Sequence, residues 1–452
     1  MSSEVIAAQL AAWRARHPEV RQVQLLFTDL NGIARGKSVR IEAFEHVFLD
    51  GLPLPSSIAA LTVDGDDSEG SGLVWEVGDM DGLARLVPGT LLPCPWLATP
   101  SAQALLSFDP AQGGPATVAD PRHLAARAIV GLTQLGYTPV LAVEWEFYLF
   151  EADYRGGAPR PATPRGAHPH VYGVEEIEAQ QAFLDDLHRC CALQRLPLVN
   201  SLSEFGPGQF EVTLAHQDDA LRALDQAVLF KRAVRGVARR HGLLASFMAK
   251  PLAGRPGSGM HLHLSLNDGD SSNAFASADS GGNALLRHAL AGMAATAPEF
   301  MALFAPFANS YRRFAPYNCV PLAPSWGVNN RTVALRIPSG AAASRRIEHR
   351  ICGADANPYL AAAAVLAGAR HGISQALEPG PPVEGDGYAV AGGVALPRHW
   401  PQAIEALAAS RFARDSLGER FVDVFTAVKR TESERWFAEV PQQDYDWYLH
   451  TL

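Results

Sequence analysis

The amino-acid sequence predicts an α+β protein, because strand-like and helix-like segments are both abundant in it. Several short segments alternate apolar and polar residues, which is typical of strands with one buried face. Several longer segments place apolar residues three and four positions apart, which is typical of helices that cover a core. At 452 residues the chain exceeds the usual size of one compact core, so we expect two domains.

The first domain is predicted to span residues 1–110. Residues 4–16 read as an amphipathic helix that stops before Pro18, and residues 20–41 alternate like a hairpin with Asp-Leu-Asn-Gly as its turn. A Pro-rich and then acidic loop covers residues 51–69, and short strands follow as far as Phe108. The Gly- and Pro-rich segment from Asp109 to Pro121 is a break in composition, and we take it as the linker.

The second domain, residues 111–452, is predicted to alternate helices with strands. A helix should begin after Asp120, a plausible N-cap, with Pro121 in its first turn and Gly136 at its end. An exposed loop is expected at residues 267–283. Further helices are expected at residues 175–195, 218–242, 284–304 and 357–378, and strands at residues 141–151, 259–266, 329–338 and 344–351.

Composition limits the function. The net charge is −9, which gives no reason to expect a nucleic-acid or anionic-membrane partner, so a small metabolite is the more natural ligand. The first residues lack the basic-then-apolar order of a secretory signal, and no apolar run reaches the length of a membrane span. The five cysteines form no CxxC pair. We therefore expect a soluble, cytoplasmic protein with reduced thiols.

Two carboxylates stand on one face of the most apolar strand, Leu-Ala-Val-Glu-Trp-Glu-Phe-Tyr-Leu-Phe-Glu at residues 141–151. Side chains alternate along a strand, so Glu144 and Glu146 share a face while Val143, Trp145 and Phe147 lie on the other. A buried carboxylate without a partner is costly. The chain must therefore supply cations, hydrogen bonds or protons to match these two.

Two more glutamates, Glu204 and Glu211, flank a Gly-Pro-Gly turn. A single glutamate beside a turn is usually solvated, but four in apolar segments weaken that interpretation. His261, His263 and Ser265 share one face of the strand at residues 259–266. A lone histidine is more often a hydrogen-bonded core residue than a ligand. Two histidines with many glutamates and no cysteine favour magnesium or manganese over zinc.

Arginines gather in the C-terminal half, at positions 312, 313, 331, 336, 346 and 350. Arginines at strand edges are usually solvated or paired with surface acids, but so many in an acidic protein indicate an anionic ligand. Divalent cations on carboxylates beside arginines are the usual equipment of phosphoryl transfer from a nucleotide. The chain contains neither a Walker-type nor a Rossmann-type glycine motif, so a P-loop or dinucleotide fold is not supported.

Over nearly its whole length the sequence resembles the glutamine synthetase family. Its motifs occur in that family's order: ExE, E…PGQxE, GSGMHxH, NSYxR, NR…RxP and RRIExR. The resemblance implies an N-terminal β-grasp domain and a catalytic domain whose antiparallel strands form a half-barrel backed by helices. It also implies a homo-oligomer, a double hexameric ring with active sites between adjacent subunits.

The resemblance further implies two or three Mg²⁺ or Mn²⁺ ions per site, with ATP and glutamate as substrates. One metal would be held by Glu146, Glu204 and Glu211, and another by Glu144, His261 and Glu348. Gly257, Arg313 and Arg350 match the glutamate-binding residues, and Arg331 and Arg350 act in catalysis with Glu204 as the candidate proton acceptor. His263, Ser265, Arg331, Arg336 and Arg346 match the ATP-binding residues.

Two departures from the family pattern concern the amine that attacks γ-glutamyl phosphate. Aligning Ser56 and Ser57 with the family's FDGSS segment puts Leu54 in the place of an ammonium-binding aspartate, which the neighbouring subunit contributes. Counting six residues from Arg313 puts Cys319 in the place of an ammonium-binding glutamate. An apolar opening lined by Leu54, Tyr172 and Cys319 suits an organic amine better than ammonium.

The sequence therefore looks most like the γ-glutamylpolyamine synthetase branch. Three alternatives stay open: ordinary glutamine synthetase, a ligase for a monoamine such as ethanolamine, isopropylamine or an aromatic amine, and a non-catalytic member. Pro256 replaces a frequent asparagine, so the grip on glutamate can differ in detail. The family's adenylylation-type tyrosine loop has no clear match, so we expect no such regulation.

Overall fold

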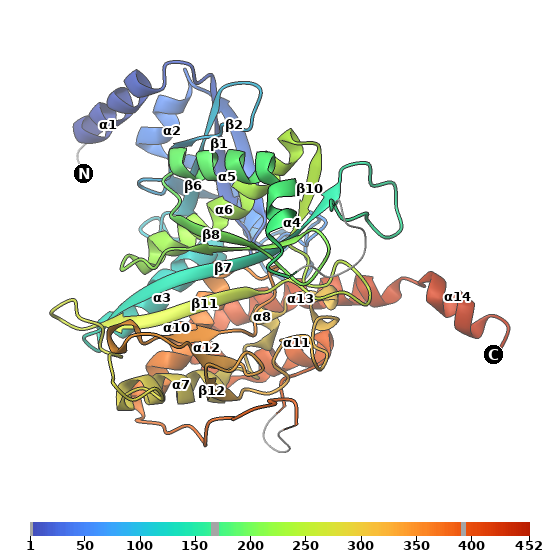
Figure 1. Cartoon of the computed structure of the whole chain (residues 1–452). Helices are drawn as coiled ribbons and strands as arrows, with labels where there is room; N and C mark the ends of the chain where they lie inside the picture. Colours follow the sequence, from blue (N-terminus) through green and yellow to red (C-terminus); the bar gives the residue numbers. More distant parts are fainter. Residues whose placement is uncertain (1–2, 164–170, 390–394) are drawn as a thin grey trace.

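The computed structural model describes residues 3–163, 171–389 and 395–452, which form two β-sheets and the helices that pack on them (Figure 1). The first sheet has six strands in the order β2-β1-β6-β4-β3, with β5 beside β6. Its central pair, β1 and β6, runs parallel and its other pairs are antiparallel, as in a β-grasp domain. These strands are β1 (Gln22–Thr28), β2 (Ala34–Arg40), β3 (Leu52–Pro55), β4 (Asp81–Leu86), β5 (Leu92–Pro93) and β6 (Ser101–Phe108), with helices α1 (Ser3–Arg16) and α2 (Phe44–Asp50).

The second sheet has eight strands in the order β12-β13-β14-β11-β7-β9-β8, with β10 beside β7. All its pairs except β12 with β13 are antiparallel, and it forms the predicted half-barrel. The strands are β7 (Thr138–Glu151), β8 (Leu198–Ser203), β9 (Gln209–Leu214), β10 (Leu243–Ser246), β11 (Met260–Asn267), β12 (Trp326–Val328), β13 (Leu335–Ile337) and β14 (Ile347–His349). The α+β class predicted from the sequence is confirmed.

Helices pack against this second sheet and against one another. α6 (Ala220–Arg240) and α3 (Pro121–Thr133) contact β7, and α10 (Pro358–Ser374) packs between α3 and α7 (Ala284–Thr296). In Figure 1, α14 (Gln442–Tyr448) lies at the end of a tail that extends away from the body. The remaining helices are α4 (Val174–Ala179), α5 (Gln181–Leu193), α8 (Met301–Phe304), α9 (Ala308–Tyr311), α11 (Trp400–Ala409), α12 (Arg411–Leu417) and α13 (Glu419–Ala438).

Two helices predicted as single elements are each divided in the structure. The segment 175–195 breaks at Gln180, so that α4 packs against β8 while α5 lies along α6. The segment 284–304 breaks after Thr296, next to Pro298, and resumes as α8. Proline has no N–H to donate and clashes with the preceding turn, which explains the second break. The predicted strand at residues 329–338 shrinks to three residues, β13.

Asp120 connects the first sheet to α3. Its side chain caps α3 by accepting the N–H of Arg122 at 2.9 Å, as the sequence predicted. The same carboxylate accepts the hydroxyl of Ser107 and the N–H of Phe108, both at the end of β6. The start of α3 is therefore fixed to the first sheet. The division into domains at residue 110 stays a prediction.

A buried charged cluster ties the turn between β1 and β2 to α13. Glu432 accepts the side-chain amide of Asn31 at 2.9 Å, the N–H of Val63 at 2.7 Å and the ammonium of Lys429 at 2.8 Å. Lys429 also donates to Asn31 and lies 4.2 Å from the centre of the Phe307 ring. Segments from the two ends of the chain thus share one hydrogen-bonded core.

Lys231 of α6 has a buried amino group in the main core. Its Nζ donates to the carbonyl of Ala354 at 2.9 Å and lies 4.8 Å from the centre of the Trp145 ring. Burial, and more weakly the charge of Arg235, lowers the pKa of Lys231 from 10.5 to about 7. Losing water disfavours the charged form.

We expect Lys231→Met to flatten the pH dependence of stability between about pH 7 and pH 10. In that window the unfolded wild-type chain keeps a proton on Lys231 that the folded chain has released, so its free energy of unfolding rises with pH. Methionine cannot titrate, so the variant should lack that part of the slope. Urea unfolding of both chains at a series of pH values measures the difference, and parallel curves would contradict the expectation.

None of the described helices combines the length and the apolar character that crossing a membrane requires. The five cysteines are free thiols, four of them buried and Cys319 exposed.

Candidate active site

Strand register brings the predicted polar residues onto one face of the second sheet. Glu144 of β7 lies opposite His261 of β11, and Glu146 of β7 lies opposite Glu211 of β9. His263 of β11 lies opposite Glu348 of β14. Directly opposed residues share a face of the sheet, so four neighbouring strands aim these side chains at one region.

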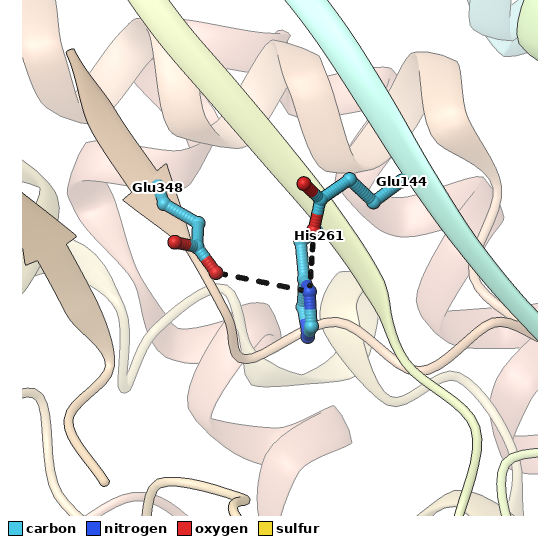
Figure 2. Close-up of side chains that lie close together, drawn as sticks. All are labelled: Glu144, His261 and Glu348. Carbon is cyan, nitrogen blue, oxygen red and sulfur yellow. Dashed lines mark hydrogen bonds and ion pairs between the residues drawn. The ribbon is translucent and has the colours of Figure 1, made fainter. Parts of the chain in front are cut away.

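His261 lies at the centre of this group. Its Nδ1 is 3.2 Å from a carboxylate oxygen of Glu144 and 3.8 Å from one of Glu348, as Figure 2 shows. Its Nε2 is 3.8 Å from an oxygen of Glu146. The ligand atoms of Glu144, His261 and Glu348 lie within 4.8 Å of one another, so this set can hold a metal ion.

A second such set shares the histidine. Potential ligand atoms of Glu146, Glu211 and His261 also lie within 4.8 Å of one another. The sequence grouped Glu204 with Glu146 and Glu211, whereas this closest set contains His261 in its place. Glu204 follows β8 and is held by its backbone N–H, which donates to the carbonyl of Gln209 at 2.9 Å across the Gly-Pro-Gly turn. The charge of Glu146 nevertheless reaches Glu204.

The carboxylates repel one another. Burial, together with the charge of Glu146, raises the pKa of Glu204 to about 7. Burial and the neighbouring glutamates likewise raise the pKa of Glu211 well above its ordinary value. Like charges at short range disfavour ionisation, so this face of the sheet favours binding protons or cations. The negative charge there exceeds what the histidines alone can balance.

Glu348 and Glu144 differ from these two because they have cationic partners. Burial alone would raise the pKa of Glu348, but Arg350 and the two histidines lower it to about 2. Burial would also raise the pKa of Glu144, but His261 and His263 hold it well below the ordinary range. One oxygen of Glu144 lies 2.9 Å from Nε2 of His263, although the pair is not aligned for a hydrogen bond.

Two arginines grip Glu348 from neighbouring positions. Arg336 donates to one of its oxygens at 2.8 Å, and Arg350 donates to the other. Among the described residues, neither the buried Nε of Arg336 nor that of Arg350 has a hydrogen-bond partner. A buried donor without a partner is costly. Both guanidinium groups therefore have a donor that the described residues leave unused.

The predicted glutamate-binding residues lie together. Arg313 is buried and donates to the carbonyls of Ile351 at 2.7 Å and Arg350 at 3.4 Å. A Cβ at Gly257 would come within 2.4 Å of the Ala249 carbonyl and 2.8 Å of Cγ of Arg313. The backbone of Gly257 can approach Arg313 this closely only because it has no side chain.

The predicted nucleotide-binding residues form two groups. Arg331 and Arg336 line a cavity of about 920 Å³ together with Asn329. Arg346 donates through Nε to Nδ1 of His263 at 3.2 Å, and Ser265 follows two residues later on the same face of β11. The cavity is rich in polar groups, as a phosphate-bearing ligand requires.

The three predicted amine-pocket residues have different surroundings. Cys319 is exposed, and its carbonyl accepts Nη2 of Arg350 at 3.4 Å. Tyr172 is exposed, and its N–H donates to the carbonyl of Ser203 at 2.9 Å, next to Glu204. Leu54 is fully buried in the core of the first sheet, so within one chain it does not join the other two.

Sequence reasoning missed two residues that support the site. Asn329 accepts Nη2 of Arg336 at 2.8 Å, and the hydroxyl of Tyr148 donates to the carbonyl of Pro256 at 2.9 Å. Tyr148 shares its strand face with Glu144 and Glu146, and this alternation in the sequence could have identified it as a site residue. The role of Asn329 depends on a fold-level contact that the sequence does not reveal.

The half-barrel, with its glutamates, histidines and arginines on one face, defines the class of protein: an enzyme whose site is built for anionic ligands. The chain belongs to the glutamine synthetase family, because the model of the glutamine synthetase catalytic domain matches residues 118–448. Enzymes of this family use ATP and divalent metals. The predicted family membership is confirmed.

Within the family, the chain is similar to several ligases that act on amines and to solved structures. The chain is 38% identical over 442 residues to γ-glutamylputrescine synthetase of Escherichia coli strain K12, covering 96% of this chain and 93% of that protein. It is 33% identical over 422 residues to glutamate–isopropylamine ligase of a Pseudomonas species, covering 90% of each. A solved GmaS–ADP complex matches with a TM-score of 0.86 at 26% identity, covering 98% of this chain and 99% of that one.

Proposed function

We propose that this enzyme uses ATP to join an organic amine, with polyamines preferred, to the γ-carboxylate of glutamate through γ-glutamyl phosphate. The observation that carries the proposal is Cys319, an exposed thiol beside Arg350 where the resemblance places an ammonium-binding glutamate. Similarity to ligases for putrescine and isopropylamine supports the same choice.

The residues present fit divalent cations. Buried carboxylates with raised pKa values and a histidine within reach of three glutamates make a donor set of oxygen and nitrogen atoms. We assign one ion to Glu144, His261 and Glu348 and another to Glu146, Glu204 and Glu211. Oxygen-rich sets of this kind favour Mg²⁺ or Mn²⁺ over zinc, and a third ion per site is compatible with them. When bound, the ions supply positive charge that offsets the phosphate oxygens during transfer.

Protein side chains position the substrates. Arg313 grips the α-carboxylate of glutamate, and the backbone of Gly257 lies near its amino group. Arg350, whose buried Nε is unpartnered among the described residues, faces the γ-carboxylate. Phosphoryl transfer to a γ-carboxylate oxygen leaves ADP, and in our assignment Arg331, Arg336, Arg346, His263 and Ser265 hold the nucleotide.

The amine nitrogen then attacks the acyl phosphate. A C–N bond forms, the C–O bond to phosphate breaks, inorganic phosphate leaves and the nitrogen loses a proton. Glu204 is the candidate acceptor by its position after β8, beside Tyr172. Arginines aimed at the developing charge act by preorganised electrostatics.

The complete site is proposed to lie between adjacent subunits of a double hexameric ring. Leu54 is buried within the first sheet of its own chain. Its contribution to a neighbour's amine pocket therefore rests on the resemblance alone. The boundary between a first domain at residues 1–110 and a second at residues 111–452 is proposed on the same basis. A cytoplasmic enzyme fits the free thiols and the use of ATP.

A panel of amines tests the function. With ATP, glutamate and Mg²⁺, we expect phosphate release to depend on putrescine or another organic amine and to be weak with ammonium at the same concentration. Strong turnover with ammonium would make the protein an ordinary glutamine synthetase. Cys319→Glu should shift the preference towards ammonium, because it adds the missing carboxylate. Cys319→Ser, the matched control, should leave the preference unchanged.

A further inference from the structure

Two tyrosines flank the position of Cys319 in space. Tyr317 is 79% exposed and its ring centre lies 5.3 Å from that of Tyr388, with the ring planes inclined by 58°. Two rings at this separation contact each other and together present an exposed aromatic surface. Aromatic surfaces bind alkylammonium groups through cation–π attraction.

Tyr317 and Cys319 both adopt a strained backbone conformation. The φ of Tyr317 is +63° and that of Cys319 is +53°, in the left-handed region that bulky side chains avoid. Conformations of this kind cost about 1–3 kcal/mol each and cluster at functional sites. Tyr317 presents its ring to solvent despite this cost, at a distance of two residues from the carbonyl that Arg350 contacts.

Tyr388 is held in place, because its segment is bonded to the edge of the catalytic sheet. Trp326 donates its indole N–H to the carbonyl of Gly380 at 2.7 Å and accepts the N–H of Val383 at 2.7 Å. The N–H of Gly387 donates to the hydroxyl of Thr332 at 2.9 Å. The hydroxyl of Tyr388 donates to the carbonyl of Val320 at 3.2 Å, which joins this segment to the turn that carries Cys319.

The carboxylate of Asp386 is bonded to the backbone of Tyr388. One oxygen of Asp386 accepts the N–H of Tyr388 at 2.9 Å, and its side chain is exposed. The nearby cation Arg350, which contacts the carbonyl of Cys319, is already paired with Glu348. An ammonium group that lies over the pair of rings would therefore meet aromatic surface and one carboxylate.

We propose that Tyr317, Tyr388 and Asp386 bind the second, non-reacting ammonium group of the amine substrate, so that the preferred substrate is a diamine or longer polyamine. This inference rests on the proposed function. The reacting nitrogen lies towards Arg350 and Cys319, the methylene chain passes the thiol, and the distal ammonium group reaches the two rings.

A matched pair of amines tests it. Putrescine and butylamine have the same carbon chain but differ by one amino group, and KM for each is measured by phosphate release. In the wild type, putrescine should have the lower KM. Asp386→Asn, Tyr317→Leu and Tyr388→Leu should each raise the KM for putrescine by about threefold to thirtyfold, the range of one cation–π or charge contact. Their effect on the KM for butylamine should be much smaller.

Controls separate binding from folding. Tyr388→Phe keeps the aromatic face and should keep most of the preference for putrescine, whereas Tyr388→Leu should lose it. Tyr445→Leu and Asp415→Asn alter an exposed tyrosine and an acid on the exposed face of α12, and the ratio of the two KM values should not change. If the ratio of the two KM values stayed unchanged in all three test variants while turnover was intact, this inference would be overturned and the proposed function would stand. If no tested amine supported turnover by the wild type, the proposed function would fail, and this inference would fail with it.

Discussion

Glu146→Ala is expected to abolish turnover with every amine, by about a thousandfold or more, since offsetting phosphate charge with a metal is worth several kcal/mol. One oxygen of Glu146 accepts the N–H of Gly259 at 2.7 Å, and the other lies 3.8 Å from His261. Alanine removes one of the carboxylates assigned to the metal position of Glu146, Glu204 and Glu211. Phosphate release with putrescine, butylamine and ammonium measures the loss.

Glu151→Ala is the matched control, because Glu151 ends the same strand but forms a surface ion pair with Arg160. It should retain activity. If Glu146→Ala still turned over at a rate near that of the wild type, the metal assignment would be wrong, whatever the amine.

Lys429→Met should lower the free energy of unfolding by about 3–5 kcal/mol, because removing one member of a buried ion pair leaves the other uncompensated. Glu432 would keep its bonds to Asn31 and Val63 but lose its cation. Methionine preserves most of the volume, so the change tests charge rather than packing. Urea unfolding at neutral pH measures the effect.

Arg430 supplies a control from the next position of the same helix. It pairs with Glu405 at 2.7 Å, but both side chains are largely exposed. Arg430→Met should therefore cost no more than about 1 kcal/mol. The double variant Lys429→Met/Glu432→Gln should recover much of the lost stability, because glutamine removes the unpaired charge but keeps an acceptor for Asn31 and Val63. Equal losses in the two single variants would contradict the assignment of Lys429 to a buried core.

Local periodicity made the faces of the strands predictable. The alternation in residues 141–151 assigned Glu144 and Glu146 to one face, and the structure places both among the cluster residues. The hairpin of β1 and β2 and the N-cap at Asp120 were also readable from a few neighbouring residues. Each of these features depends on interactions close along the chain.

Contacts between distant segments were not predictable from pattern alone. At the break at Gln180 the chain turns, so that α5 packs mainly on α6 while α4 packs on β8, and a single amphipathic stripe does not record that turn. The pairing of β11 with both β7 and β14 is likewise a property of the folded sheet. The sharing of His261 between two sets of glutamates is another property of the folded sheet alone.

The order of strands in the sheet differs from the order in which they are synthesised. β7, β9 and β11 emerge from the ribosome long before β13 and β14, although β14 is hydrogen-bonded directly to β11. A nascent chain that ends before Arg336 carries the four site glutamates of β7, β9 and the turn before β9, but lacks Arg336, Arg346 and Arg350. During translation, until the last strands arrive, the two histidines of β11 and protons or ions from solution have to balance the charge of that half-built face.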